Sequence, residues 1–178
     1  MTAPAFIQGK TLILRPLTVD DASDAYLAWL NDAEVLRYRG PKAFPSRRTD
    51  MERFLERIQG GGDLHLAICL REGGTHVGNL SLNAINWPHG HCELSIMIGA
   101  RDQWGRGLGG EAIDLATRHA FHSMGLRRLW AESPNPSFNA AVKRLGWTHE
   151  GTKRQAFLLE GAHVDIECWG LLKSEWKA

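Results

Sequence analysis

The chain has 178 residues, of which 43% are hydrophobic and 23% are charged, with a formal net charge of +1. This length and hydrophobic content predict a single domain, residues 1–178, with a substantial core. The small net charge indicates no general attraction to nucleic acid or to an anionic membrane, and no run reaches the roughly eighteen apolar residues that a membrane span needs.

The three cysteines, Cys69, Cys92 and Cys168, are far apart and odd in number, and none belongs to a CxxC pair. All three lie in apolar, strand-like runs, so we expect buried free thiols in a reducing compartment. The N-terminus also lacks a charged region followed by a long apolar stretch. These features predict a cytoplasmic protein.

The first third of the chain predicts one strand and two helices. Alternating residues over 11–15 predict a strand that stops at Pro16. Asp20 or Asp21 can cap a helix that continues to about residue 30. A second helix is predicted from residues 46–50 to the glycines at 60–62, which we interpret as a flexible turn because no helix follows them.

The remaining segments alternate between strands and helices. Strands are predicted over 64–70 and 76–84, around a Glu-Gly-Gly turn, and over His91–Ile98. A long helix is expected from about 107 to 124, then a short strand over 129–131, a helix over 137–145 and strands over 147–157 and 163–172. The order β-α-α-β-β-β-α-β-α-β-β predicts an α/β fold, with a mixed (α+β) sheet and helices on its faces.

The most informative motif is the glycine-rich stretch that follows the strand His91–Ile98 and opens the long helix predicted from about 107 to 124. A strand that feeds a glycine-dense turn opening a helix is typical of a phosphate site, because the backbone can approach the anion and free N–H groups point at it. The helix dipole adds partial positive charge there, and an arginine can add a charged donor. The residues are Trp104, Gly105, Arg106, Gly107, Leu108, Gly109 and Gly110.

Two well-known phosphate motifs do not fit this spacing. A P-loop needs a Lys-Ser/Thr pair after its last glycine, and no lysine follows here. A dinucleotide-binding turn needs Gly-x-Gly-x-x-Gly after an early strand, whereas Gly105, Gly107 and Gly109 alternate past the middle of the chain.

The pattern Trp-Gly-x-Gly-x-Gly after a strand that contains a glutamate resembles motif A of the GNAT superfamily of acyl-CoA-dependent N-acyltransferases. Gly107 and Gly109 match its two small positions, and Trp104 replaces the usual Gln or Arg. That variant occurs in the branch that acetylates ribosomal-protein N-termini (RimJ/RimL type). The segments Leu14–Leu17, Val77–Asn79 and Leu145–Trp147 resemble the same branch, so the resemblance covers nearly the whole chain.

The resemblance implies a GNAT fold whose fourth and fifth strands, here His91–Ile98 and Arg128–Glu132, splay apart to admit acetyl-CoA. The glycine-rich turn would hold the pyrophosphate. The fourth strand would be bulged, and its backbone would bind the pantetheine and the thioester oxygen. Further cofactor contacts are implied for residues that follow the fifth strand. The implied backbone positions are Ile96, Met97 and Ile98, and the later residues are Asn135, Asn139 and Arg144.

Glu93 is the candidate general base, because it precedes Gly107 by the interval that the superfamily's histone-acetylating members use. A half-buried strand carboxylate tends to have a raised pKa, which suits proton abstraction. The alternative is that Glu93 pairs with a basic residue on a neighbouring strand. The family's thiolate-protonating tyrosine is replaced by Val142, which leaves Ser137 or water as the proton donor.

The acceptor implied by the resemblance is a primary amine, foremost a protein N-terminus. A small amine (an amino sugar, a polyamine or an antibiotic) is the close alternative, and a non-catalytic CoA-binding regulator is a third. We expect Trp29, Trp87 and His91 to line the acceptor side. No metal is expected, because the histidines show no zinc-ligand spacing, and the oligomeric state is left open between monomer and homodimer.

Overall fold

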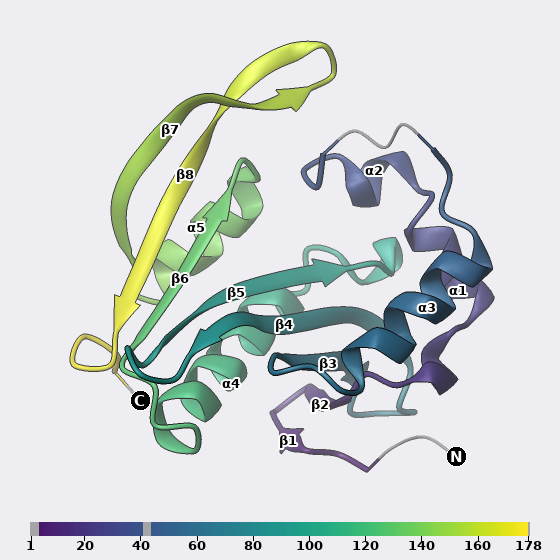
Figure 1. The fold of residues 1–178 in the computed structure, drawn as a ribbon, viewed down its shortest axis with the longest axis horizontal. Helices are drawn as coiled ribbons and strands as arrows, with labels where there is room; N and C mark the ends of the chain where they lie inside the picture. The colour runs from purple at the N-terminus through teal and green to yellow at the C-terminus, as the bar shows by residue number, and fades with distance from the viewer. Residues whose placement is uncertain (1–3, 41–43, 178) are drawn as a thin grey trace.

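The computed structural model describes residues 4–40 and 44–177 and contains one twisted sheet with helices on both faces (Figure 1). The strands are β1 (Ile7–Gln8), β2 (Leu12–Pro16), β3 (Leu64–Leu70), β4 (His76–Asn86), β5 (His91–Ile98), β6 (Arg128–Ser133), β7 (Thr148–Leu159) and β8 (Ala162–Leu172). The helices are α1 (Asp24–Trp29), α2 (Ala33–Leu36), α3 (Arg48–Ile58), α4 (Leu108–His122) and α5 (Pro136–Arg144), with 3-10 turns at Val19–Asp21 and Arg101–Gln103.

The sheet order is β1-β2-β3-β4-β5-β6-β8-β7, and every neighbouring pair is antiparallel except β5 and β6. These two parallel strands pair only at their beginnings, through His91–Glu93 and Arg128–Trp130. Beyond that point they diverge into a V that is open at the C-terminal end of β5 (Figure 1). The predicted mixed sheet and the splayed strand pair are both confirmed.

Each face of the sheet has its own apolar core. One cluster packs α4 and α5 against β2 to β6, and it includes Leu80, Leu82, Leu94 and Phe121. The other packs α1, α2 and α3 against the opposite face, with Met97 contributed by β5. Because strand side chains alternate between faces, the residues of β4 and β5 that do not face α4 point toward α1 and α3.

The start of the chain differs from the prediction in how its first long helix begins. Ser23, not Asp20 or Asp21, caps α1, and its hydroxyl accepts a hydrogen bond from the Tyr26 amide at 3.1 Å. Asp21 is instead buried and pairs with Arg15 at 2.6 Å. The elements β1 and α2 were not predicted, because two and four residues are too short to show a period.

The cysteines are free thiols, as predicted: Cys69 and Cys92 are buried and Cys168 is half-buried. No helix in the described part of the chain is long and apolar enough to cross a membrane.

Candidate active site

A cavity of about 580 Å³ occupies the V between β5 and β6. Four parts of the chain line it: the end of β5, the glycine-rich turn with the start of α4, the β6–α5 junction, and α2 with the loop after it. The β7–β8 hairpin curves over the open end of the V toward α2 (Figure 1), where Arg37 and Glu160 form an ion pair at 3.2 Å. The residues that line the cavity come from three stretches of the chain, 34–39, 93–113 and 132–141.

The glycine-rich turn provides space and hydrogen-bond donors for an anion. Gly105 and Gly107 have positive φ angles of 75° and 79°, a conformation that glycine adopts without strain. A Cβ atom on Gly105, Gly107 or Gly110 would meet nothing within 4 Å, so the space beside the turn is open. This geometry fits the pyrophosphate of a CoA molecule.

The first turn of α4 leaves its amides available. The first intrahelical bond runs from the Glu111 amide to the Gly107 carbonyl at 3.1 Å. The preceding amides of Leu108, Gly109 and Gly110 have no acceptor among the described residues, as expected at a helix N-terminus. Arg106 is exposed beside them, with its guanidinium bonded to Gln103.

The edge of β5 beyond the splay presents backbone groups to the cavity. The Ile98 carbonyl accepts a hydrogen bond from Trp104 Nε1 at 2.9 Å, and the Ile96 carbonyl accepts one from Arg39 at 3.2 Å. Both carbonyls therefore point away from β4. Because the N–H and C=O of one residue in an antiparallel strand point to the same side, the amides of Ile96 and Ile98 also face the V. The backbone groups of Met97, between them, point the other way, toward Asn79 on β4.

The expected bulge in this strand is not where the resemblance implies it. The register between β4 and β5 is continuous from Glu93 to Ile98, and it shifts only between Asn83 and Asn86. Ala84 in that shift has a positive φ of 49°. The irregularity therefore belongs to β4, beside Glu93, and the divergence of β6 alone exposes the amides of β5.

Glu93 occupies the last paired position of β5 before the V opens, opposite Trp130. Partial burial raises its pKa, and the nearby charges of Glu132 and Asp63 raise it further, against a lowering effect of Lys153. Among the described residues, Glu93 has no ion-pair partner, whereas Lys153 pairs with Glu132 at 2.6 Å. The geometry supports a general base better than a structural ion pair.

The start of α5 borders the cavity through Asn135 and Ser137. Asn135 caps the helix by accepting a hydrogen bond from the Ser137 amide at 2.9 Å. The same residue therefore both begins α5 and lines the cavity. Val142 is fully buried in the core and offers no hydroxyl. Ser137 thus remains a candidate proton donor.

Asn139 and Arg144, two expected cofactor contacts, do not line the cavity. The Asn139 amide donates to the Ser133 carbonyl at 3.3 Å and accepts from Trp169 Nε1 at 3.1 Å. Both ends of its side chain therefore hold α5 against β6 and β8. Arg144 is an exposed residue in the last turn of α5.

The three expected acceptor residues also lie outside the cavity. Trp29 is buried in the core and packs its ring at 5.1 Å from His76. Trp87 and His91 lie in and after the turn that precedes β5. Because β5 runs from the closed end of the V to its open end, this turn sits at the apex, away from the cleft (Figure 1).

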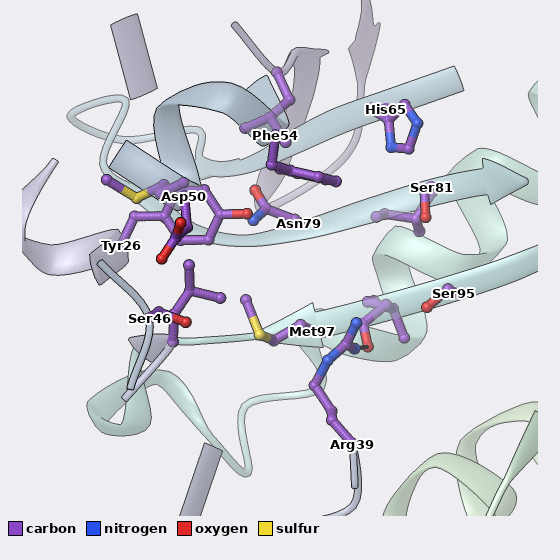
Figure 2. A pocket seen from close by; sticks show the side chains of 15 residues that line it. Tyr26, Arg39, Ser46, Asp50, Phe54, His65, Asn79, Ser81, Ser95 and Met97 are labelled. Carbon is purple, nitrogen blue, oxygen red and sulfur yellow. Dashed lines mark hydrogen bonds between the residues drawn. The ribbon is translucent and has the colours of Figure 1, made fainter. Parts of the chain in front are cut away.

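A second cavity of about 310 Å³ lies between α1 and α3 and the strands β3 to β5 (Figure 2). It shares Arg39, Ser95, Ile96 and Met97 with the first cavity, so the two meet at β5. Sequence reasoning missed it, although the alternation Asn79-Leu80-Ser81-Leu82 already indicates one polar face on β4.

Within the described ranges, no group of three or more His, Cys, Asp or Glu side chains is arranged to hold a metal ion.

Comparison with known proteins places these features in a family. Residues 11–148 match the family described as Acetyltransferase (GNAT) domain. The uncharacterised N-acetyltransferase p20 of Bacillus licheniformis is 28% identical over 176 residues, covering 94% of this chain and 96% of that protein. Two solved structures share the fold at lower identity. They are spermidine N-acetyltransferase from Vibrio cholerae with CoA and spermine (TM-score 0.84, 20% identity, 94% and 98% coverage) and ribosomal-protein-S5-alanine acetyltransferase from Vibrio fischeri (TM-score 0.81, 15% identity, 98% and 100% coverage).

Proposed function

Because the chain belongs to the GNAT acetyltransferase family, we propose that it moves an acetyl group from acetyl-CoA to a protein N-terminal amine by direct attack in a ternary complex. The observation that carries this proposal is one continuous cavity. It joins the donor-rich start of α4, the free amides of β5 and the half-buried Glu93. The CoA bound in the V. cholerae structure supports the choice of cofactor.

Each part of the cavity has a chemical task. When bound, acetyl-CoA supplies a thioester as the acyl donor, and the amides of Leu108 to Gly110 would hold its pyrophosphate. Glu93 accepts a proton from the incoming ammonium group, because only a neutral amine can attack. An N–H of Ile96 or Ile98 donates to the carbonyl oxygen as that oxygen gains charge. The C–N bond forms, the nitrogen loses its second proton to solvent as the C–S bond breaks, and the leaving thiolate takes a proton from water or from Ser137, which regains one from solvent.

The cysteines support direct attack over an acyl-enzyme route. Cys92 is next to Glu93 in sequence, but it is buried in the core on the α4 side of the sheet. Burial raises the pKa of Cys92 to about 12. Since the thiolate is the nucleophilic form, this residue is unsuited to carry the acetyl group.

The charges around the cavity favour a peptide over a polyamine as acceptor. A polyamine needs several uncompensated carboxylates, because each of its amines is cationic. The cavity has three glutamates, of which Glu132 is paired with Lys153, and it also has Arg37 and Arg39. Arginines suit the carbonyl oxygens of a peptide backbone. The two Vibrio neighbours are named for a ribosomal protein and for spermidine, so the fold does not decide between these acceptors.

The test measures the release of CoA thiol with a panel of acceptors. We expect release with peptides that have a free N-terminus and none with the same peptides blocked by N-acetylation. Internal lysines are omitted from both sets, so that only the α-amine can react. Release with spermidine or an amino sugar alone would favour the small-amine alternative. If no amine releases thiol while acetyl-CoA still binds, the non-catalytic regulator is the better interpretation.

A further inference from the structure

The smaller cavity has a polar floor built from cross-strand neighbours. His65 on β3 pairs with Ser81 on β4, and Ser81 pairs with Ser95 on β5, so the three form a row across the sheet. Asn79 and Met97 form the adjacent row. Aromatic side chains of α1 and α3, Tyr26 and Phe54, lie opposite (Figure 2). The cavity therefore combines a row of hydrogen-bonding side chains on the sheet with a mixed opposite wall, where Tyr26, Asp50 and Arg39 add polar groups to the apolar ones.

The orientation of the Asn79 amide follows from its neighbours. His76 Nε2 lies 2.9 Å from the Gly78 carbonyl and 2.8 Å from Asn79 Oδ1. Since a carbonyl can only accept, Nε2 must carry the hydrogen, and Asn79 must present its oxygen to it. Burial lowers the pKa of His76, which favours the neutral ring with this tautomer.

This arrangement leaves Asn79 Nδ2 without a partner. The atom is buried, and no described residue accepts a hydrogen bond from it. A buried donor without an acceptor costs free energy, so such groups are usually satisfied by water or by a ligand. A cavity of about 310 Å³ has room for on the order of ten water molecules, far more than one bridging water needs. The space is of the size that binds an organic group.

The cavity is also placed to reach the reacting amine. Glu93, Ser95 and Met97 occupy every second position along β5, so their side chains share the face toward α1 and α3. Ser95 and Met97 line both cavities, and Arg39 lies where the two meet. A group attached near an amine at Glu93 can therefore extend past Ser95 over β4.

We propose that the smaller cavity is the subsite for the side chain next to the acceptor amine, and that Asn79 donates a hydrogen bond to an acceptor atom at the tip of a largely apolar side chain. This assignment rests on the proposed amine acetylation and names its acceptor class: a neutral residue with an apolar body and a polar tip. Strands are roughly 4.8 Å apart, so reaching β4 from β5 takes a long side chain, such as that of tyrosine.

The test compares two peptides that differ only in an N-terminal tyrosine or phenylalanine. We expect kcat/KM to be about tenfold higher for tyrosine, the scale of one buried hydrogen bond whose loss leaves a donor unpaired. The Asn79→Leu variant should bring the ratio close to one, because it removes the donor that the tyrosine tip would meet. A wild-type ratio close to one would overturn the proposal.

Two further variants separate the role of Asn79 from its surroundings. Ser81→Ala changes the same cavity in the next row and should keep the tyrosine preference. Asn79→Asp keeps an oxygen for His76 and removes the donor, so an N-terminal O-methyltyrosine, which can only accept, should lose its advantage over phenylalanine. This second variant keeps the proposal testable if Asn79→Leu does not fold. A preference that survives both Asn79 variants would place the donor elsewhere.

Small amines that carry the same two side-chain groups separate the subsite proposal from the proposal that the acceptor is a peptide. Tyramine and phenethylamine differ by the same hydroxyl, and their binding is measured by thermal stabilisation without acetyl-CoA and by turnover with it. Acetylation of these amines but not of peptides, with tyramine preferred, would overturn the peptide acceptor and support the subsite. Acetylation of peptides with no tyrosine preference would support the function and overturn the subsite.

Discussion

The cavities on the two sides of β5 differ in the groups that they present: mainly backbone amides on one side and side chains on the other. On the side proposed to bind the cofactor, the groups assigned to the ligand are backbone amides from the end of β5 and the start of α4, which are close together in the sequence. On the acceptor side, they are side chains from α1, α3, β3, β4 and β5. Binding on the cofactor side should therefore depend on backbone conformation, whereas binding on the acceptor side should depend on individual side chains.

Glu93 lies where the two sides meet, and its replacement has the largest expected effect. Glu93→Gln should keep acetyl-CoA binding, because the cofactor contacts are mostly backbone. Turnover near neutral pH should fall by about 10²–10⁴-fold, the scale of a lost general base. Raising the pH should recover part of this loss, since more amine is then neutral. Steady-state rates from pH 6 to 9 provide the measurement, and near-parental turnover would leave Glu93 without a catalytic role.

Because the pKa of Glu93 is raised, the direction of the pH dependence can be predicted both for activity and for folding stability. Activity should rise as the carboxylate ionises, above the usual range for glutamate. A folded-state pKa above the unfolded value means that stability is lost as pH rises through it, so Glu93→Gln should melt at the same or a higher temperature at pH 7. The matched control is Glu132→Gln. This variant removes a like charge near Glu93 and frees Lys153 from its ion pair. The pKa of Glu93 should fall, so the rise of activity with pH should occur at lower pH.

The cofactor side is tested by Gly107→Glu, which places a bulky carboxylate beside the pyrophosphate site. Acetyl-CoA raises the melting temperature by binding only the folded state, and this rise should disappear in the variant. The control is Gly125→Glu at the other end of α4. Gly125 also has a positive φ, 71°, and open space around it, so it shares the backbone strain but not the site. An equal loss in both variants would assign the effect to strain.

The cofactor side could be predicted largely from the sequence, because it is local. The glycines of the turn, the strand before it and the helix after it are contiguous, so their order alone places amides at one helix end. Glu93 was proposed as the base for a similar reason, from the fixed interval to Gly107 that the resemblance implies. The bulge was misplaced because the register of β4 against β5 shifts within β4 itself, where Ala84 takes a positive φ that the sequence does not signal.

The acceptor side could not be predicted in this way. Trp29 and Trp87 are large aromatic residues of a kind often found at binding sites, but one fills the core and the other lies at the apex of the V. Asn79 is an ordinary strand residue until His76 fixes its amide, and that contact depends on tertiary packing. Its only local signal is the alternation of polar and apolar residues along β4.

The smallest effect is expected for replacement of Arg106, because the backbone amides of the turn and of α4 already form the proposed pyrophosphate site without its side chain. Arg106→Ala should raise KM for acetyl-CoA a few-fold and leave kcat largely intact, the result of losing an interaction equal in the ground and transition states. Because Arg106 is exposed, salt should reduce the difference between parent and variant. Arg118→Ala, on the exposed face of the same helix, is the matched control and should change neither constant. A large loss of kcat with unchanged KM for acetyl-CoA would instead place Arg106 on the acceptor side, and the division between a backbone-built and a side-chain-built half of the cleft would then fail at this residue.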